Sequence, residues 1–356
     1  MRTRTHIITQ ATTTATGARQ PIMPTSTSVS TRGVQDGQDE DDEDSTDALE
    51  GSLVEVTQSE IPSYFCERDG RLFHSHGASP YPLPVDTPEH QRLNVQHNII
   101  KILLGRNYCG PVPRALTNIP DRQRLVVDLG SGTGKWVMEM AGEFPHAYVV
   151  GLDIVPIGTM YPLDNVHFEV KDINERLVWS DGAVDVMHAR SISMAIHDFN
   201  ALLTEVARVL RPGGLFLSSE WIRAACVHPN LGVTPESHIP NLVRFFAMLR
   251  AALASRYGTR TLAPYVPDYL AETSHFVNID ACRVYVPIGP WVEDPIMRQI
   301  GKAYRKAFRT YVESVKPLLL QVYGGTLQEL YDGIGEELRE RRGLVGIMHV
   351  VCAERA

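Results

Sequence analysis

Three glycines alternate with other residues directly after a short apolar run, and this loop limits the possible folds more than any other stretch of the chain. Residues 126–136 read Val-Val-Asp-Leu-Gly-Ser-Gly-Thr-Gly-Lys-Trp, which is typical of a buried strand that ends in a turn and continues as a helix. Because glycine has no Cβ atom, the backbone can turn tightly there and lie close to a ligand. The loop residues expected at that ligand are Gly130, Ser131, Gly132, Thr133 and Gly134.

The spacing of these glycines separates two kinds of cofactor. The dinucleotide fingerprint has one residue between its first two glycines and two residues before the third. Here all the gaps are single, and Lys135 or Val137 stands where that third glycine would fall. Asp128, at the end of the expected strand, would repel a diphosphate and attract the ammonium group of an amino acid. The loop therefore favours S-adenosylmethionine over a nicotinamide cofactor.

Downstream of the loop, apolar runs of strand length alternate with helical segments. The expected strands are 125–129, 147–152, 166–170, 184–189 and 215–219, and the expected helices are 135–143 and 200–210. Arg-Pro-Gly-Gly at 211–214 is expected to end the second helix. The alternation predicts an α/β fold with a Rossmann-like, doubly wound, mostly parallel sheet covered on both faces. Ligands of such sheets bind beyond the carboxyl ends of the strands.

Three acidic residues, Asp128, Asp153 and Asp172, stand where three successive strands end. Asp153 lies 19 residues after Gly134, the spacing at which an acid after the second strand accepts hydrogen bonds from the ribose hydroxyls. An ordinary loop acid or helix cap is the alternative. Asp172 could accept from the adenine amino group while the Ile173 amide donates to a ring nitrogen, or it could cap the following turn.

Further candidates stand at the same expected edge. Ile154 would cover a face of the adenine, unless it packs in the core. His188, Ala189 and Arg190 end the fourth strand, where the backbone would line the sulfonium of the cofactor. The candidates for a general base are His188, His197, Glu220 and His97, and each also fits a structural role.

The first sixty residues are expected to be disordered. They are rich in Thr, Ser, Gly and Gln and hold eleven acidic residues against four arginines, a net −7 of the formal total of −8. Such a segment cannot bury enough apolar surface to offset the entropy lost on ordering. It is interpreted as a solvated tail, with an acidic arm for a protein partner as the alternative, and its start weakly resembles a transit peptide. The rest of the chain is near neutral, which gives no support for nucleic-acid binding.

Neither a metal site nor a disulfide framework is expected. Five cysteines are scattered along the chain, at Cys66, Cys109, Cys226, Cys282 and Cys352. Their odd number and wide spacing are typical of reduced thiols in an intracellular protein. His74 and His76 have no nearby acidic or cysteine cluster to complete a metal site. No stretch approaches the apolar length of a membrane span, and the expected location is the cytoplasm or the nucleus.

Blocks before and after the loop carry a resemblance to a known family. Upstream stand Gly-Arg-Leu-Phe-His at 70–74 and Tyr-Pro-Leu-Pro-Val-Asp at 81–86, followed by Glu89, Arg92-Leu93 and Gln96-His97. Downstream stand His-Ala-Arg at 188–190, Glu205, residues 208–214, Glu220, residues 287–291 and residues 300–301. From about residue 62 to the end, the chain resembles the class I S-adenosylmethionine-dependent methyltransferases, and specifically the fungal LaeA-like type associated with regulation of secondary metabolism.

The resemblance implies a seven-stranded sheet with a reversed last strand, for which residues 345–353 fit. It also implies that a helix near 89–103 lies over the cofactor, so that Gln96 and His97 could reach it, with packing as the alternative. The implied activity is methyl transfer from S-adenosylmethionine, with S-adenosylhomocysteine as the product.

The expected organisation has four parts: a disordered acidic tail (1–60), an N-terminal helical cover (61–120), a cofactor-binding core (121–221) and an acceptor-side region with the final strands (222–356). Within the last part, residues 238–340 are interpreted as a helical insertion, with one helix starting at Asp294-Pro295. Four aromatic residues there would wall an acceptor pocket or pack in the core: Tyr265, Tyr269, Phe276 and Tyr285.

The expected function is transfer of a methyl group to an oxygen or nitrogen of a small-molecule natural product. The alternative is a nuclear regulatory protein that binds S-adenosylmethionine and acts through protein partners. No membrane, nucleic acid or metal partner is expected.

Overall fold

The computed structural model describes residues 30–32, 53–156, 158 and 161–356. Most of the segment expected to be disordered, residues 1–60, lies outside the described residues. Its disorder therefore stays a prediction.

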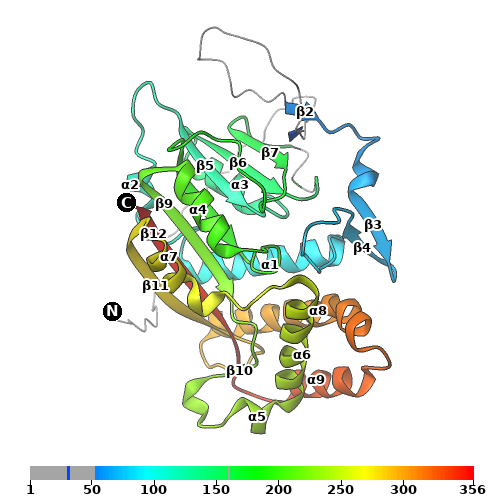
Figure 1. The fold of residues 1–356 in the computed structure, drawn as a ribbon. Coiled ribbons are helices and arrows are strands. Elements are labelled where there is room, and N and C mark those ends of the chain that lie inside the picture. The colour runs from blue at the N-terminus through cyan, green and yellow to red at the C-terminus, as the bar shows by residue number, and fades with distance from the viewer. Residues whose placement is uncertain (1–29, 33–52, 157, 159–160) are drawn as a thin grey trace.

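One large sheet organises the described part of the chain (Figure 1), which places ten strands in it. Its main strands are, in spatial order, β7 (Val166–Val170), β6 (Ala147–Asp153), β5 (Arg124–Leu129), β8 (Val184–Arg190), β9 (Leu210–Trp221), β12 (Leu344–Arg355) and β11 (Phe276–Pro287). The strands from β7 to β9 run parallel, whereas β12 runs antiparallel to both β9 and β11. The expected mostly parallel sheet with a reversed last strand is thus confirmed.

Three short strands extend this frame. β1 (Ser30–Arg32) pairs with β7 and with β2 (Leu53–Glu55), and β10 (Cys226–Val227) pairs with β12. A separate hairpin is formed by β3 (Phe65–Arg68) and β4 (Arg71–His74). This hairpin precedes the helix that covers the site.

Helices cover both faces of the sheet because successive strand residues point to opposite sides. On one face, Val127 and Met187 pack with α4 (Phe199–Val209) and α7 (Val266–Glu272). On the other face, Val126 and Val186 pack with α2 (Val112–Ala115) and α3 (Lys135–Glu143). The residues of β5 and β8 that pack in these two cores are apolar on both sides, as is typical of a doubly covered parallel sheet.

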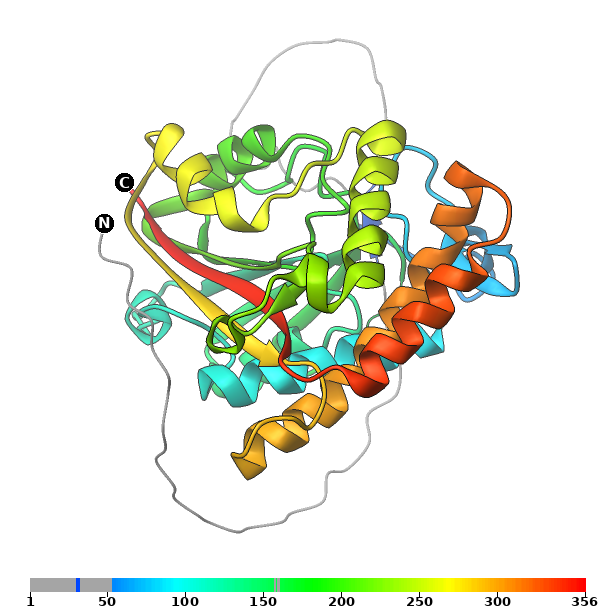
Figure 2. The ribbon, with the colours of Figure 1, turned by 90° about the horizontal axis from the view of Figure 1, so that it is seen from below.

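A helical layer stands against the carboxyl ends of the strands (Figure 2). It consists of α1 (Thr87–Leu104), α6 (Pro240–Tyr257), α8 (Pro295–Tyr323) and α9 (Gln328–Glu340), which share one apolar core, and the short α5 (Pro235–His238) precedes α6. Asp86 caps α1 by accepting from Glu89 N (3.2 Å), and Asp294 caps α8 by accepting from Met297 N (2.8 Å). The expected start of α8 at Asp294-Pro295 is confirmed.

Two expected boundaries were wrong. Residues 238–340 are not all helical, because they contain β11, whose side chains pack on both sides of the sheet edge beside β12. The segment at 211–214 does not separate a helix from a strand. Instead β9 starts at Leu210, directly after α4, and Pro212 and Gly213 lie where the pairing with β8 shifts register. A bulge at this point accommodates residues that a regular ladder would disfavour.

Candidate active site

A deep cavity lies at the carboxyl ends of the parallel strands. Its walls come from the ends of β5 to β9, from α1 and from the inner sides of α6 and α8, and it encloses about 1530 Å³ of space, including open solvent at its mouth. A smaller hollow follows the glycine loop, and both hollows are lined by Gln96, Gly132 and Arg190. The two hollows therefore adjoin each other at these residues.

The backbone conformation of the glycine loop, between β5 and α3, explains why glycine stands at two of its positions. Gly132 and Gly134 have φ angles of +55° and +71°, in the left-handed region that other residues avoid. A Cβ atom at Gly134 would lie 2.5 Å from Cζ of Phe168, whereas the nearest atom at Gly132 would be Leu93 Cδ1 at 3.5 Å. Gly134 is thus required by packing, and Gly132 presents an open face to the cavity.

Two hydrogen bonds tie the loop to its surroundings. Ser131 N donates to Leu152 O (2.7 Å), and Thr133 Oγ1 donates to Asn94 Oδ1 on α1 (2.8 Å). Gly130 and Gly132 line both hollows, and Ser131 and Thr133 line the smaller one. Four of the five predicted loop residues therefore line the two hollows. Gly134 does not line them and packs against the Phe168 ring.

Asp153 connects the end of β6 to the glycine loop. Its Oδ2 accepts from Gly132 N (2.8 Å) and its Oδ1 from Val155 N (3.3 Å), and the side chain lines the cavity beside Ile154. Burial raises the pKa of this carboxyl to about 6, and the nearby charge of Asp128 adds to the effect. One carboxylate thus fixes the loop and presents acceptor lone pairs to a ligand.

Asp172 and Ile173 follow β7 and line the same cavity. Asp172 Oδ1 accepts from the backbone N and the Nδ2 of Asn174 (2.9 and 2.8 Å). The turn-capping role considered for Asp172 is therefore present, and the carboxyl also lies at the cavity wall. The two roles are compatible because the second oxygen is engaged only at 3.9 Å, by His76.

Asp128 and His188 form a buried pair beneath the loop. Asp128 Oδ1 lies 2.7 Å from His188 Nδ1, and the His188 ring stacks on Trp136 with centroids 3.9 Å apart. Burial lowers the pKa of His188, although Asp128 opposes this. His188 lines neither hollow, and Ala189 is buried in the sheet core. His188 therefore orients Asp128, which lines the smaller hollow, and its catalytic role stays a prediction.

The smaller hollow is lined by the positively charged Arg190 as well as by Asp128. Arg190, at the end of β8, lines both hollows, and its Nη2 donates to His97 Nδ1 (3.1 Å). Burial and the Arg190 charge lower the pKa of His97 to about 4, so this histidine stays neutral and accepts the bond. Asp128 and Arg190 together suit a ligand group with one positive and one negative charge.

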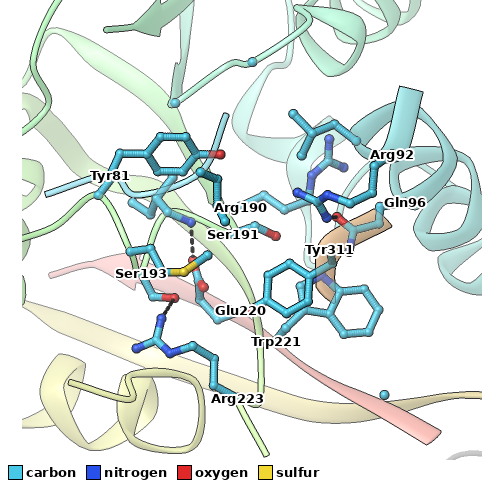
Figure 3. Close-up of a pocket in the computed structure, with 18 of the residues that line it drawn as sticks. Tyr81, Arg92, Gln96, Arg190, Ser191, Ser193, Glu220, Trp221, Arg223 and Tyr311 are labelled. Atoms are coloured by element: carbon cyan, nitrogen blue, oxygen red, sulfur yellow. Dashed lines mark hydrogen bonds between the residues drawn. The ribbon is translucent and has the colours of Figure 1, made fainter. Parts of the chain in front are cut away.

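The turn after β8 is held by Glu220 at the end of β9 (Figure 3). Glu220 Oε1 accepts from Ile192 N (2.7 Å), and the carboxyl is also hydrogen-bonded by Ser193. Ser191, at the start of this turn, has a φ of +60°, a conformation that a non-glycine residue adopts only where its surroundings enforce it. Burial raises the pKa of Glu220 to about 7, against the lowering effect of those hydrogen bonds.

His197 lies away from these groups. Its side chain is exposed, its Nε2 pairs with Ala78 O (2.8 Å), and it lines a separate shallow pocket. Of the four candidates for a general base, only Glu220 lines the main cavity, and His97 lines the smaller hollow.

The cavity is lined by aromatic rings other than those expected. Its aromatic lining residues are Tyr81, Trp221, Phe246, Tyr304, Phe308 and Tyr311. Tyr265, Tyr269, Phe276 and Tyr285 do not line it; Tyr269 and Phe276 pack on Phe199 and Phe216. Tyr304, Phe308 and Tyr311 recur at helical spacing along α8, but this spacing does not show that they line the cavity.

Sequence reasoning gave no role to the polar residues that fasten α1 to α8. Arg92 donates to Glu89 Oε1 through Nε (2.9 Å), and Ser314 Oγ on α8 donates to Glu89 Oε2 (3.0 Å). Arg92 Nη1 also donates to Gln96 Oε1 (2.7 Å), which holds Gln96 at the cavity wall. Glu89 and Arg92 are both buried. The upstream sequence block thus supplies the polar contacts that join α1 to α8 beside the cavity.

Two further findings concern the described residues alone. No three His, Cys, Asp or Glu side chains gather there in an arrangement that could hold a metal ion. In the same residues, no helix has the length and apolar character needed to cross a membrane.

Comparisons with known proteins identify a class of enzyme to which the chain is similar. A family model for a methyltransferase domain matches residues 121–230. The chain is 29% identical to methyltransferase pytC of Aspergillus terreus, covering 76% of this chain and 81% of the relative. It is also 29% identical to the secondary metabolism regulator laeA of Coprinopsis cinerea, covering 77% of this chain and 68% of the relative.

Among solved structures, Haemonchus contortus phosphoethanolamine N-methyltransferase 2 in complex with S-adenosyl-L-methionine is similar, with a TM-score of 0.42 and 15% identity. That match covers 80% of this chain and 62% of the other.

The matched domain spans the glycine loop and the strand-end acids, so the chain is a class I methyltransferase that depends on S-adenosylmethionine. Within that class it is similar to the fungal LaeA-like proteins, since relatives named as methyltransferases and as LaeA-type regulators both match most of its length. The resemblance found in the sequence is thereby confirmed.

Proposed function

We propose that this chain transfers a methyl group from S-adenosylmethionine to a small-molecule natural product, on oxygen or nitrogen. The observation that carries the proposal is that the adjoining hollows have two unlike ends. The glycine loop and the strand-end acids form one end, and aromatic rings from α6 and α8 form the other. A charged nucleoside fits the first end, and a mainly apolar molecule fits the second.

The residues at the first end fit the parts of the donor. Asp153 would accept from the ribose hydroxyls and Asp172 from the adenine amino group. Asp128 and Arg190 would bind the ammonium and carboxylate of the methionine part. The backbone of the glycine loop would lie along the ligand, and Gln96 would cover it from α1. The residues that flank the adenine would be Ile154 and Ile173.

The donor, when bound, supplies a methyl group on a positively charged sulfur. The chain's own contribution would be to align the acceptor with this methyl group and to exclude water from the site. Helices α1 and α8, which are joined through Glu89 and Ser314, would cover the site. Glu220 is the candidate base that lines the cavity, and a pKa of about 7 allows it to take up a proton near neutral pH. The same carboxyl holds the turn that starts at Ser191.

Calorimetric titration of the full chain with S-adenosylhomocysteine tests the first step. We expect one site per chain. Asp153→Asn should weaken binding by about 10- to 100-fold, because a hydrogen bond to a charged acceptor contributes about 1.5–3 kcal/mol. Asp164→Asn, at an exposed residue, is the matched control and should bind as the original chain does. Absence of binding at millimolar ligand would refute the proposal.

The alternative function, regulation through protein partners, is favoured by the relatives named as secondary metabolism regulators. Comparison of metabolites between a strain that lacks the gene and its parent separates the two. A product that is one methylene heavier only in the parent supports the enzyme. Intact cofactor binding with no methylated product in any extract would favour the regulator.

The pH dependence of cofactor binding follows from the raised pKa of Asp153, about 6. Because the ionised carboxylate is the better acceptor, affinity for S-adenosylhomocysteine should fall about tenfold between pH 7 and pH 5. Stability changes in the opposite direction: a carboxyl with a folded pKa above its usual 3.8 favours the folded, ligand-free chain as pH falls from 6 toward 3.8. Titrations at several pH values check this, and Asp153→Asn should remove most of the pH dependence. An affinity independent of pH in the original chain would contradict it.

A further inference from the structure

Two cysteines that are far apart in the sequence lie side by side in the fold. Cys109 stands in the segment that joins α1 to α2, and Cys352 stands near the end of β12. A hydrogen bond links the two thiols. Both side chains pack in the apolar core between α2, α3 and the sheet. The fold therefore pairs two of the five cysteines that the sequence shows only as scattered residues.

The backbone around both residues fixes this contact. Cys109 Sγ donates to the carbonyl oxygen of Val351 (3.5 Å), the residue before Cys352. A Cβ atom placed on Gly110 would overlap Cys352 Sγ, so the Cys352 thiol packs directly on the backbone that follows Cys109. Glycine at position 110, where φ is +71°, leaves the space that this thiol occupies.

The segments that carry the two cysteines are also held in place at other points. Trp136 Nε1 on α3 donates to Asn107 O (2.7 Å), which anchors the segment before Cys109. Arg114 Nη2 on α2 donates to Glu354 Oε2 near the end of β12 (2.9 Å). A disulfide forms readily only between cysteines that the fold already holds close together, and these contacts do so here.

The two thiols differ in their tendency to ionise. The hydrogen bond with Cys109 lowers the pKa of Cys352, whereas the same bond and burial raise the pKa of Cys109. The thiolate is the form of cysteine that reacts with an oxidant, so Cys352 is the site of the first oxidation. Because Cys352 is only 6% exposed and Cys109 is half-buried, the oxidant must be small.

We propose that Cys109 and Cys352 are an oxidative modification site, where hydrogen peroxide forms a disulfide between the segment after α1 and the end of β12. Peroxide first oxidises the Cys352 thiolate to a sulfenic acid and releases hydroxide. The Cys109 sulfur then displaces the oxygen of the sulfenic acid as water, and the S–S bond forms. In total, two thiols lose two protons and two electrons, and one peroxide becomes two molecules of water.

The disulfide would join the helical cover to the last strand at a distance from the proposed methyl-transfer site. β12 lines the cavity with Leu344, Val345 and Gly346 at its start, whereas Cys352 lies near its other end. The inference therefore does not depend on the proposed function. Its expected effect is on stability, because a cross-link that closes a long loop restricts the unfolded chain.

Peptide mapping of the full chain tests the proposal. The reduced protein is freed of reductant, treated with hydrogen peroxide at an equimolar amount, denatured in iodoacetamide and digested without reduction. We expect a peptide pair linked through Cys109 and Cys352 that is two hydrogens lighter than its two parts and is split by dithiothreitol. Recovery of these cysteines as alkylated thiols, or as sulfinic or sulfonic acids, would overturn the proposal. A disulfide from either of them to the exposed Cys282 would do the same.

Thermal unfolding measures the effect of the disulfide. The oxidised chain should unfold at a temperature about 5 °C higher than the reduced chain, and Cys109→Ser should abolish both the linked peptide and this rise. Cys66→Ser is the matched control, because Cys66 is also half-buried and donates to a carbonyl, His74 O (3.3 Å), but lies in the separate β3–β4 hairpin. It should keep both the linked peptide and the rise. No rise in the original chain, or an equal rise in Cys109→Ser, would contradict the proposal.

Discussion

Substitution of Asp185 with alanine is expected to lower the free energy of unfolding by about 3–5 kcal/mol, since it leaves buried positive charge without a partner. Asp185 is fully buried at the start of β8, far along the strand from the cavity. Its Oδ1 accepts from Arg124 Nη1 (2.7 Å) and Arg211 Nε (2.6 Å), and its Oδ2 accepts from Leu125 N (3.0 Å). Arg124 is itself only 3% exposed. Urea unfolding followed by circular dichroism measures the loss.

Asp181 provides the matched control for this prediction. Its carboxyl also pairs with an arginine, Arg208 (2.7 Å), but its side chain is 79% exposed. Exposed pairs contribute about 0–1 kcal/mol, so Asp181→Ala should have little effect. Equal losses for Asp185→Ala and Asp181→Ala would show that burial does not determine the contribution of the Asp185 pairs. The folded fraction of Asp185→Ala should still bind the cofactor, because Asp185 lies at the opposite end of β8 from Arg190.

The order of strands and the positions of the strand-end acids could be predicted because both follow from local patterns. A buried parallel strand is mainly apolar, so an acid that follows an apolar run indicates where the strand ends. That is how Asp128, Asp153 and Asp172 were placed at one edge, where the structure has them. The glycine loop gave equally local information, since positive φ values require glycine at particular positions.

The role of His188 could not be predicted in the same way. The alternation of side chains along β8 does not show which face of the strand end lines the cavity. In the structure the His188 ring stacks on Trp136 and lines neither hollow. The strand β11 was missed because helical periodicity was strong on both sides of it. Its own residues are only partly buried at a sheet edge, so they lack the continuous apolar run of a central strand.

The end of the cavity proposed for the acceptor depends on contacts between segments that are distant in the sequence. Arg223 owes its position to Ser193 and Arg260, and Trp221 owes its orientation to Tyr304. None of these pairs has a fixed sequence spacing, so no local pattern could indicate them. The sequence therefore predicts the strand-end residues well and the aromatic lining of the cavity poorly.

Substitution of Gly132 with valine is expected to weaken S-adenosylhomocysteine binding by about 1000-fold or more, equivalent to roughly 4 kcal/mol. A non-glycine residue at a φ of +55° costs about 1–2 kcal/mol. The branched side chain would also project into the part of the cavity that the cofactor needs, where Leu93 Cδ1 is the nearest atom at 3.5 Å. Relief of that strain would move Gly132 N away from Asp153, which it now contacts at 2.8 Å.

Because the Cβ position at Gly132 meets no backbone atom within 4 Å, the variant should fold, with a small loss of stability. Gly142→Ala, at an exposed residue of α3 with open space around it, is the matched control. It should keep full affinity and gain up to about 1 kcal/mol of stability, since alanine favours the helix. Calorimetric titration and urea unfolding of both variants give the comparison. Binding by Gly132→Val within threefold of the original chain would show that the cofactor does not lie against this loop, and the assignment of both ends of the cavity would then have to be revised.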